Sequence, residues 1–296
     1  MSTSPSLLKA ELILVSVTII AAFGWIFSKE ALAELPPIFF LGVRFVIAGI
    51  VLFFVGARFF KGIRWQDLKG ATLVGAVMSI AMMFWIVGLD QVSNIGVGAF
   101  INSLGVILVP VFARFMFKER PARSIWIALP IAVIGLGCLA LGNGVSFEWA
   151  QGFFLVSAIT FAFQFNLLTR MSTKLHVLVL TAIQLFTAGV VMLMVSPTIE
   201  EVPHSVSLPI VGWFLASTLI ATSLRFLLQT YGQSLTPASH AAVIMNLEPV
   251  WTALLAAIWF SETMTSLQLI GCALIFSAML VSKWSQVRAF LRRKTA

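Results

Sequence analysis

The chain has 296 residues, of which 60% are hydrophobic and only 10% are charged. An average globular protein has roughly 45–50% apolar and about 25% charged residues, and the mean hydropathy of this chain is +1.03. A soluble domain of this length needs a charged surface that this composition cannot supply, so we expect lipid to surround most of the chain. Cys138 and Cys272 both lie in apolar segments without a closely spaced partner, so we expect no disulfide framework, no metal and no cofactor.

Apolar segments of about 20 residues, the length that a helix needs to cross the hydrocarbon, recur along the whole sequence. They predict an all-α integral membrane protein with ten transmembrane helices and short loops, which leaves no room for an extramembrane domain. Strands of a membrane barrel are about ten residues long and alternate in polarity, so segment length favours helices. The expected helices are residues 10–28, 38–58, 70–89, 94–117, 124–142, 148–169, 176–196, 209–231, 238–260 and 267–286.

The positive charges predict how these helices are oriented. If the chain begins in the cytoplasm, fifteen of its 19 Lys and Arg residues lie in cytoplasmic segments, whereas Lys29 alone lies outside. The positive-inside rule then places both termini in the cytoplasm, and we expect a multi-pass protein of a bacterial-type inner membrane. The net charge of +8 is thereby explained by topology, which leaves no support for binding of nucleic acid. Most tryptophans, Trp25 among them, lie near the ends of the expected helices, as in a headgroup belt.

The two halves of the sequence resemble each other at a nearly constant offset. Residues 14–16 (Leu-Val-Ser) recur as residues 155–157, and residues 115–119 align with residues 258–262. We interpret this as a duplicated five-helix unit. Because five is odd, the second copy inserts upside down, and inverted repeats place a substrate site near the bilayer midplane between two units that rock to give alternating access. The expected parts are residues 1–145, residues 146–286 and a basic cytoplasmic tail of residues 287–296.

Residues 246–262 read Asn-Leu-Glu-Pro-Val-Trp-Thr-Ala-Leu-Leu-Ala-Ala-Ile-Trp-Phe-Ser-Glu. This stretch resembles the penultimate helix of the drug/metabolite transporter superfamily, in particular the EamA family, with Pro249 near the centre of the expected helix and Glu262 at its end. The first repeat departs from the pattern, since Val106 aligns with Pro249 and a proline follows only at Pro110. The resemblance covers essentially the whole chain. Within the family, the sequence looks like the YddG-type inner-membrane exporters of aromatic and other neutral amino acids.

Ionisable residues inside the expected helices are candidate functional residues, because an unpaired charge in lipid costs several kcal/mol. Glu248 is placed in the middle of the ninth helix, beside Pro249, which removes a helical hydrogen bond. Its carboxylate could couple transport to a proton, bind a substrate ammonium group, or form a structural ion pair. Arg44 could bind a carboxylate, pair with Glu248 or extend toward the membrane surface. Arg114 and Arg225 are expected near cytoplasmic ends, as structural residues.

Neutral amides occupy similar depths in several of the expected helices. Asn102 and Asn246 lie at nearly equivalent positions of the two repeats, and Gln164 lies in the sixth helix. An amide can bond both the ammonium and the carboxylate of a zwitterion, although the same groups can also join two helices without a ligand. We expect these three amides to bind the substrate. Further candidates line an apolar, adaptable wall or serve as plain packing: Phe23, Met78, Met82, Trp85, Phe161 and Phe163.

The sequence therefore predicts a secondary transporter that exports amino acids or related small metabolites by alternating access. An exporter of drugs or other metabolites with the same fold is the alternative. An integral membrane enzyme is disfavoured because Asp67 and Asp90 are far apart and no histidine lies near either. No phosphate-binding loop is present, so no ATP motor is expected. We expect the protein to act on its small-molecule substrate within the lipid bilayer, as a monomer or a homodimer.

Overall fold

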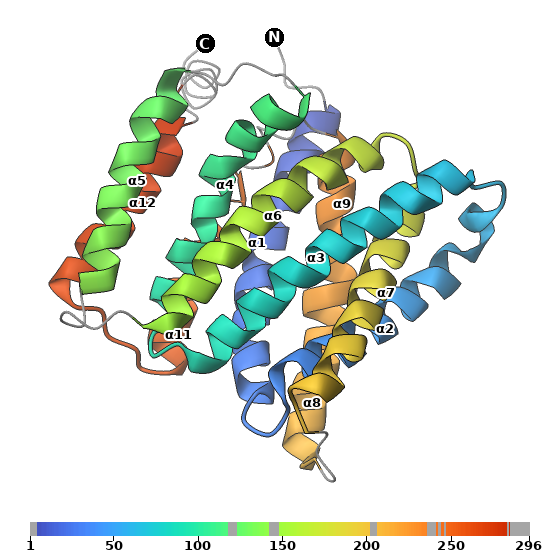
Figure 1. The fold of residues 1–296 in the computed structure, drawn as a ribbon, viewed down its shortest axis with the longest axis horizontal. Coiled ribbons are helices and arrows are strands. Elements are labelled where there is room, and N and C mark those ends of the chain that lie inside the picture. Colours follow the sequence, from blue (N-terminus) through green and yellow to red (C-terminus); the bar gives the residue numbers. More distant parts are fainter. Residues whose placement is uncertain are drawn as a thin grey trace.

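The computed structural model describes residues 5–117, 123–141, 148–201, 206–235, 241, 244–245, 247–282 and 284. Throughout this part of the chain the regular structure is helical, which confirms the all-α prediction (Figure 1). A π-helical segment, Leu219–Leu224, joins α8 to α9 in one continuous span. The helices are α1 (Pro5–Ala31), α2 (Pro37–Gly56), α3 (Trp65–Gln91), α4 (Ile95–Phe117), α5 (Arg123–Leu141), α6 (Trp149–Ser172), α7 (Val177–Val195), α8 (Leu208–Thr218), α9 (Arg225–Leu235), α11 (Glu248–Trp259) and α12 (Ser266–Ser282).

Prolines mark where several of these helices begin. Pro37 of α2 and Pro209 of α8 lie at the first or second helical position, where the missing N–H has no helical partner to lose. Seven spans in the described part are long and apolar enough to cross a membrane, and shorter apolar stretches lie in α5 and α12. Nine of the ten expected segments coincide with these helices to within a few residues.

The segment expected as one helix over residues 238–260 differs. Its described C-terminal part, α11, begins only at Glu248, after a turn at Leu247. Pro249 therefore lies in the first turn of a helix and not in the middle of one. The expectation that Pro249 removes a helical hydrogen bond is wrong, because residues of a first turn have no such bond to lose. Glu248 is instead placed at a helix N-terminus, where the helix dipole favours a negative charge.

The main contacts between helices recur when each helix of the first half is exchanged for its counterpart in the second half. Helix α2 packs on α7 and α5 packs on α12, while the contact of α3 with α6 corresponds to that of α1 with α8 and α9. Figure 1 shows that α1 and α6 run in opposite directions, and that α1 begins and α12 ends at the same end of the bundle. This is the symmetry expected of a duplicated, inverted five-helix unit.

The closest approach of α2 and α7 has the same symmetry in atomic detail. A Cβ added to Gly49 would lie 2.7 Å from the backbone N of Phe186, and one added to Gly189 would lie 2.6 Å from the backbone N of Val46. Gly189 follows Gly49 by 140 residues, as Phe186 follows Val46. Small residues at such crossings let two backbones approach without a side chain between them.

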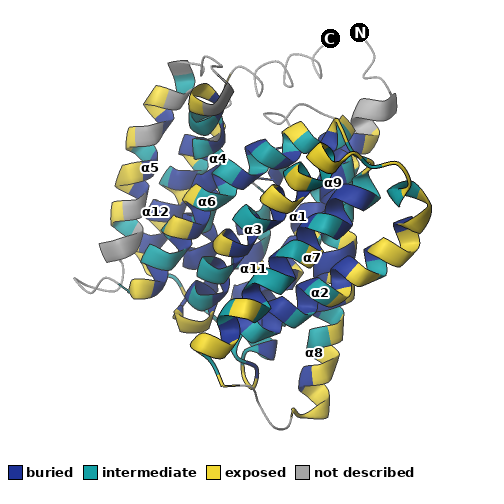
Figure 2. Cartoon of the chain, turned by 45° about the vertical axis from the view of Figure 1, so that its right-hand side comes forward, coloured by how far each residue is buried: buried dark blue, intermediate teal, exposed yellow. Residues whose placement is uncertain are grey.

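The exposed surface of the bundle is apolar, as expected for a protein solvated by lipid. Large hydrophobic side chains are more than half exposed at Phe54, Phe115, Trp126 and Ile258. Figure 2 shows exposed residues along the outer faces of α5 and α8, with buried residues toward the centre. The main buried core includes side chains from both halves of the chain.

Two carboxylates of the second half bind the N-termini of α2 and α4, helices of the first half, which both begin at the lower end of the bundle in Figure 1. Glu200 accepts hydrogen bonds from the backbone N–H groups of Ile38 (2.7 Å) and Phe39 (2.8 Å) at the start of α2. Glu262 accepts one from Ile95 (3.0 Å) at the start of α4, and burial raises the pKa of this carboxyl although that bond opposes the rise. These bonds tie the two halves together at this end.

Candidate functional site

A central cavity lies between α1, α2, α3, α4, α6, the α8–α9 span and α11, so both halves of the chain contribute to it. It contains about 1030 Å³ of space free of protein atoms, part of which is open to solvent. Most of its wall is apolar. The lining residues with polar side chains are Trp25, Arg44, Trp85, Asn102, Ser103, Gln164, Arg225, Gln229 and Glu248.

Arg44, on α2, is 4% exposed and is held by hydroxyl groups. Its Nη1 donates to Ser28 Oγ (2.8 Å) and its Nε donates to the hydroxyl of Thr222, which lies in the π-helical segment. The guanidinium also lies over the rings of Phe40 and Phe45. The alternative in which Arg44 pairs with Glu248 is wrong, because another arginine is paired with the Glu248 carboxylate.

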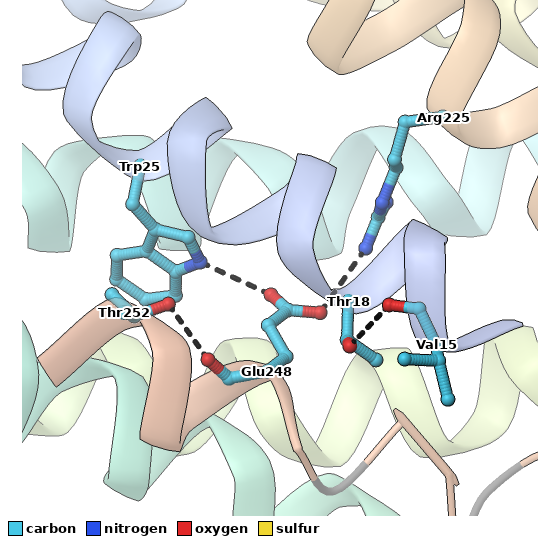
Figure 3. A network of polar contacts seen from close by, with 6 residues as sticks. All are labelled: Val15, Thr18, Trp25, Arg225, Glu248 and Thr252. Atoms are coloured by element: carbon cyan, nitrogen blue, oxygen red, sulfur yellow. Dashed lines mark hydrogen bonds and ion pairs between the residues drawn. The ribbon is translucent and has the colours of Figure 1, made fainter. Parts of the chain in front are cut away.

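That arginine is Arg225, the first residue of α9 (Figure 3). Its Nη2 lies 3.4 Å from Glu248 Oε2, while Glu248 Oε1 accepts a hydrogen bond from Trp25 Nε1 (3.1 Å). Thr252 donates to the backbone oxygen of Glu248 (3.0 Å), one turn further along α11. Both side chains of the ion pair are largely buried, with 13% of Arg225 and 18% of Glu248 exposed.

The expectation that Arg225 lies near a membrane surface is wrong. It assumed that the eighth span ends at residue 231, whereas the span reaches Leu235, ten residues beyond Arg225. At 1.5 Å per residue, about 15 Å of helix separates Arg225 from that end. Arg225 therefore faces the cavity with its charge paired to Glu248, and it does not extend out of the membrane.

Three polar atoms of lining residues are buried and have no hydrogen-bond partner in the described part of the chain. They are Nε of Arg225, Oδ1 of Asn102 and Oε1 of Gln229. One is a donor with a positive charge and two are acceptors. Because buried polar groups in proteins are nearly always paired, three such atoms around one cavity indicate that a ligand or water binds there.

The structure brings most of the candidates from the sequence together. Met82, Trp85, Asn102, Phe161 and Gln164 line the cavity with Arg44 and Glu248. Among the aromatic residues of this wall, the indole rings of Trp85 and Trp25 meet edge to face at 5.0 Å.

Three candidates lie outside the lining. Phe23 is 38% exposed and stacks on Phe27, Met78 is fully buried in the core, and Phe163 packs edge to face on Phe112. Asn246 falls outside the described residues. Phe23, Met78 and Phe163 do not line the cavity, and the role of all four residues in binding stays a prediction.

Sequence reasoning missed Trp25, Arg225 and Gln229 as site residues. Trp25 was placed in a headgroup belt but is 3% exposed. The signal for the other two is helical spacing, since Arg225 and Gln229 are four residues apart and share a face of α9. In the described part of the chain, no group of acidic, histidine or cysteine side chains is placed to hold a metal.

Comparison with known proteins decides the family. The model of the EamA-like transporter family matches this chain twice, over residues 8–141 and 148–283. The chain belongs to the EamA-like transporter family. An uncharacterized transporter of Archaeoglobus fulgidus is 28% identical over 276 residues, covering 93% of this chain and 85% of that protein. The uncharacterized inner membrane transporter YedA of Escherichia coli K12 is 26% identical over 261 residues, covering 83% of this chain and 82% of YedA.

A solved crystal structure supports the same fold for this EamA-like chain. It has 17% sequence identity and a TM-score of 0.69, and the match covers 93% of this chain and 98% of that one. At this identity the likeness shows the fold alone. As a member of the family, the protein is a multi-pass membrane transporter, and its central cavity is the candidate transport site.

Proposed function

We propose that this EamA-like protein is a secondary transporter that exports aromatic and other neutral amino acids, or related small metabolites, from the cytoplasm by alternating access. The observation that carries the proposal is the central cavity, because helices of both halves line it and it combines charged, amide and aromatic side chains. A site between two inverted units becomes accessible from each side in turn when one unit rocks against the other.

The lining suits an amino acid in three respects. Arg44 and Arg225 supply donors for a carboxylate, and Glu248 supplies an acceptor for an ammonium group. Asn102 and Gln164 add amides that can bond either group. Trp85, Met82 and Phe161 supply an apolar wall for an aromatic or aliphatic side chain.

The proposal includes the orientation expected from the charges. Both termini lie in the cytoplasm, the two repeats occupy residues 1–145 and 146–286, and the membrane is a bacterial-type inner membrane. The positive-inside distribution and the name of the relative YedA support this assignment.

Counterflow into liposomes tests the proposal. Purified protein is reconstituted into vesicles loaded with an unlabelled candidate substrate, and uptake of a labelled amino acid is followed. We expect uptake of labelled phenylalanine or leucine only into vesicles loaded with a neutral amino acid. Counterflow of cationic drugs without counterflow of any amino acid would instead support a drug exporter of the same fold, and absence of counterflow for all classes contradicts secondary transport.

A further inference from the structure

The charges that face the central cavity do not balance. Arg44, Arg225 and Glu248 are the ionisable residues among the described lining, so two positive charges meet one negative charge. The two guanidinium groups repel each other across this space. An uncompensated charge at membrane depth is costly and marks a site that binds an ion or a charged ligand.

The two arginines differ in what holds them. Arg44 donates to two hydroxyl groups and lies against two phenyl rings, so its guanidinium is fixed by neutral partners. Arg225 lies over the ring of Phe226, but it has one carboxylate contact, of 3.4 Å, and its Nε has no hydrogen-bond partner in the described part of the chain. Arginine–carboxylate pairs usually form two parallel bonds of about 2.7–2.9 Å. Arg225 is therefore incompletely paired, and its Nε–H is a buried donor without a partner in the described part of the chain.

The acceptors without partners are placed to bind a second group of the same ligand. Asn102 Oδ1 on α4 and Gln229 Oε1 on α9 both belong to residues that line the cavity. Each can accept a hydrogen bond from an amino or hydroxyl group. Most of the remaining wall is apolar, with Trp85, Met82 and Phe161 among its members.

We propose that the substrate carries a carboxylate, and that this carboxylate binds the unpartnered Nε edge of Arg225 as the second negative charge in the cavity. The first negative charge is that of Glu248, which stays paired with Arg225, so that two negative charges then balance the two arginines. A polar group next to the substrate carboxylate donates to Asn102 or Gln229, and the apolar body contacts Trp85. This inference deepens the proposed function by naming the group that the transporter requires, and it holds whether the carboxylate belongs to an amino acid or to a simple carboxylic acid.

Three ligands of similar size separate the contribution of the carboxylate to binding from that of the ammonium group. Phenylalanine has a carboxylate and an ammonium group, 3-phenylpropionate has the carboxylate alone, and phenethylamine has the ammonium group alone. Binding to purified protein is measured by calorimetry, and matched aliphatic ligands (leucine, 4-methylpentanoate and 3-methylbutylamine) form a second set. We expect binding of at least one carboxylate ligand and at least tenfold weaker binding of the amine in the same set, since a hydrogen bond to a charged group is worth about ten- to a hundred-fold in affinity.

The binding measurements distinguish an amino acid from a simple carboxylic acid as the natural source of the carboxylate. Binding of the amino acid but not of the simple acid shows that both charged groups are required, whereas equal binding shows that the carboxylate suffices. Either result supports the proposal. Amines that bind as tightly as their matched carboxylates, or a complete lack of binding by carboxylates, overturn it.

Variants test the assignment to Arg225. Because Arg225→Gln alone leaves Glu248 buried without its partner, we pair the changes in a double variant, Arg225→Gln with Glu248→Gln, which keeps an acceptor for Trp25. We expect this variant to fold and to bind the carboxylate ligand ten- to a hundred-fold more weakly. Glu248→Gln alone increases the excess positive charge, so 3-phenylpropionate or its aliphatic analogue should bind more tightly. Arg114→Gln, at an exposed arginine near the end of α4, is the matched control.

These measurements separate this proposal from the proposed function. A carboxylate ligand that binds through Arg225 but shows no counterflow contradicts secondary transport and leaves the carboxylate site intact. Transport of phenethylamine without any carboxylate ligand contradicts the site and leaves transport intact. Unchanged affinity in a folded double variant contradicts the role of Arg225.

Discussion

Arg44 on α2 donates a hydrogen bond to the hydroxyl of Thr222, in the π-helical segment between α8 and α9. Thr222 is fully buried and also donates to the backbone oxygen of Ser217 (3.0 Å), five residues earlier. A π-helical turn shifts the following residues around the helix axis and is often found at functional sites. Here it places an acceptor against Arg44, the cavity-lining arginine for which the described part of the chain supplies no carboxylate partner.

We predict that Thr222→Val destabilises the protein by roughly 1–3 kcal/mol, because the buried guanidinium of Arg44 loses a hydrogen-bond partner while the shape of the side chain is kept. Thermal unfolding of the purified protein in detergent measures the effect. Thr160→Val is the control, since the one hydrogen bond of the Thr160 hydroxyl within the described residues goes to Val156 of its own helix. Equal melting temperatures for the two variants would show that Ser28 alone suffices to hold Arg44.

The second prediction concerns orientation in the membrane. In a variant without Cys138 and Cys272, a single thiol is introduced at Lys61 or at Glu201, both of which are exposed. We expect a membrane-impermeant maleimide added to intact cells to label Glu201→Cys but not Lys61→Cys, and to label both after the cells are opened. The reverse pattern contradicts the orientation derived from the positive-inside rule.

The sequence predicted the helices well because lipid imposes one requirement on every spanning segment. Each needs about 20 apolar residues, and that length is visible without knowledge of packing. The exception, the segment over residues 238–260, shows the limit of this reasoning. Apolar composition does not reveal that α11 begins at Glu248, since a turn within a hydrophobic segment depends on the helices around it.

The site was predicted only in part for the same reason. Glu248 stands out in sequence because a carboxylate in lipid is unusual. Its partners Arg225 and Trp25 lie 23 and 223 residues away along the chain, and only the packing of α9 and α11 on α1 brings the three residues together. Composition can therefore find a buried charge, but the identity of its partner depends on tertiary structure.

The third prediction concerns the contact between the two halves. Gly189→Ala places a methyl group 2.6 Å from the backbone N of Val46, where the overlap is relieved only if α2 and α7 move apart. We expect a loss of about 1–3 kcal/mol in stability. Gly137→Ala on α5 is the control, because nothing lies within 4 Å of its added Cβ and alanine favours a helix by up to about 1 kcal/mol. If both variants are stabilised, α2 and α7 are less tightly packed than the structure shows.

The last prediction separates residues that bind the substrate from residues that hold helices together. Losing one hydrogen bond to a charged group of the ligand lowers affinity by about ten- to a hundred-fold. We therefore expect Gln164→Ala and Asn102→Ala to weaken amino-acid transport by that factor with nearly unchanged melting temperature. For Asn102 the structure supports this expectation, because its Oδ1 has no partner in the described part of the chain and so does not join two helices.

Trp85→Ala should act differently, since the indole forms part of the apolar wall and meets Trp25 edge to face. Removing the ring enlarges the cavity, so transport of leucine relative to phenylalanine should change while both remain substrates. Gln91→Ala and Phe54→Ala, at exposed positions, are the matched controls for an amide and an aromatic ring. Transport rate and melting temperature are compared for all five variants in liposomes. Equal losses of both quantities would mean that these side chains are structural, and the cavity would then bind its substrate mainly through its charged residues.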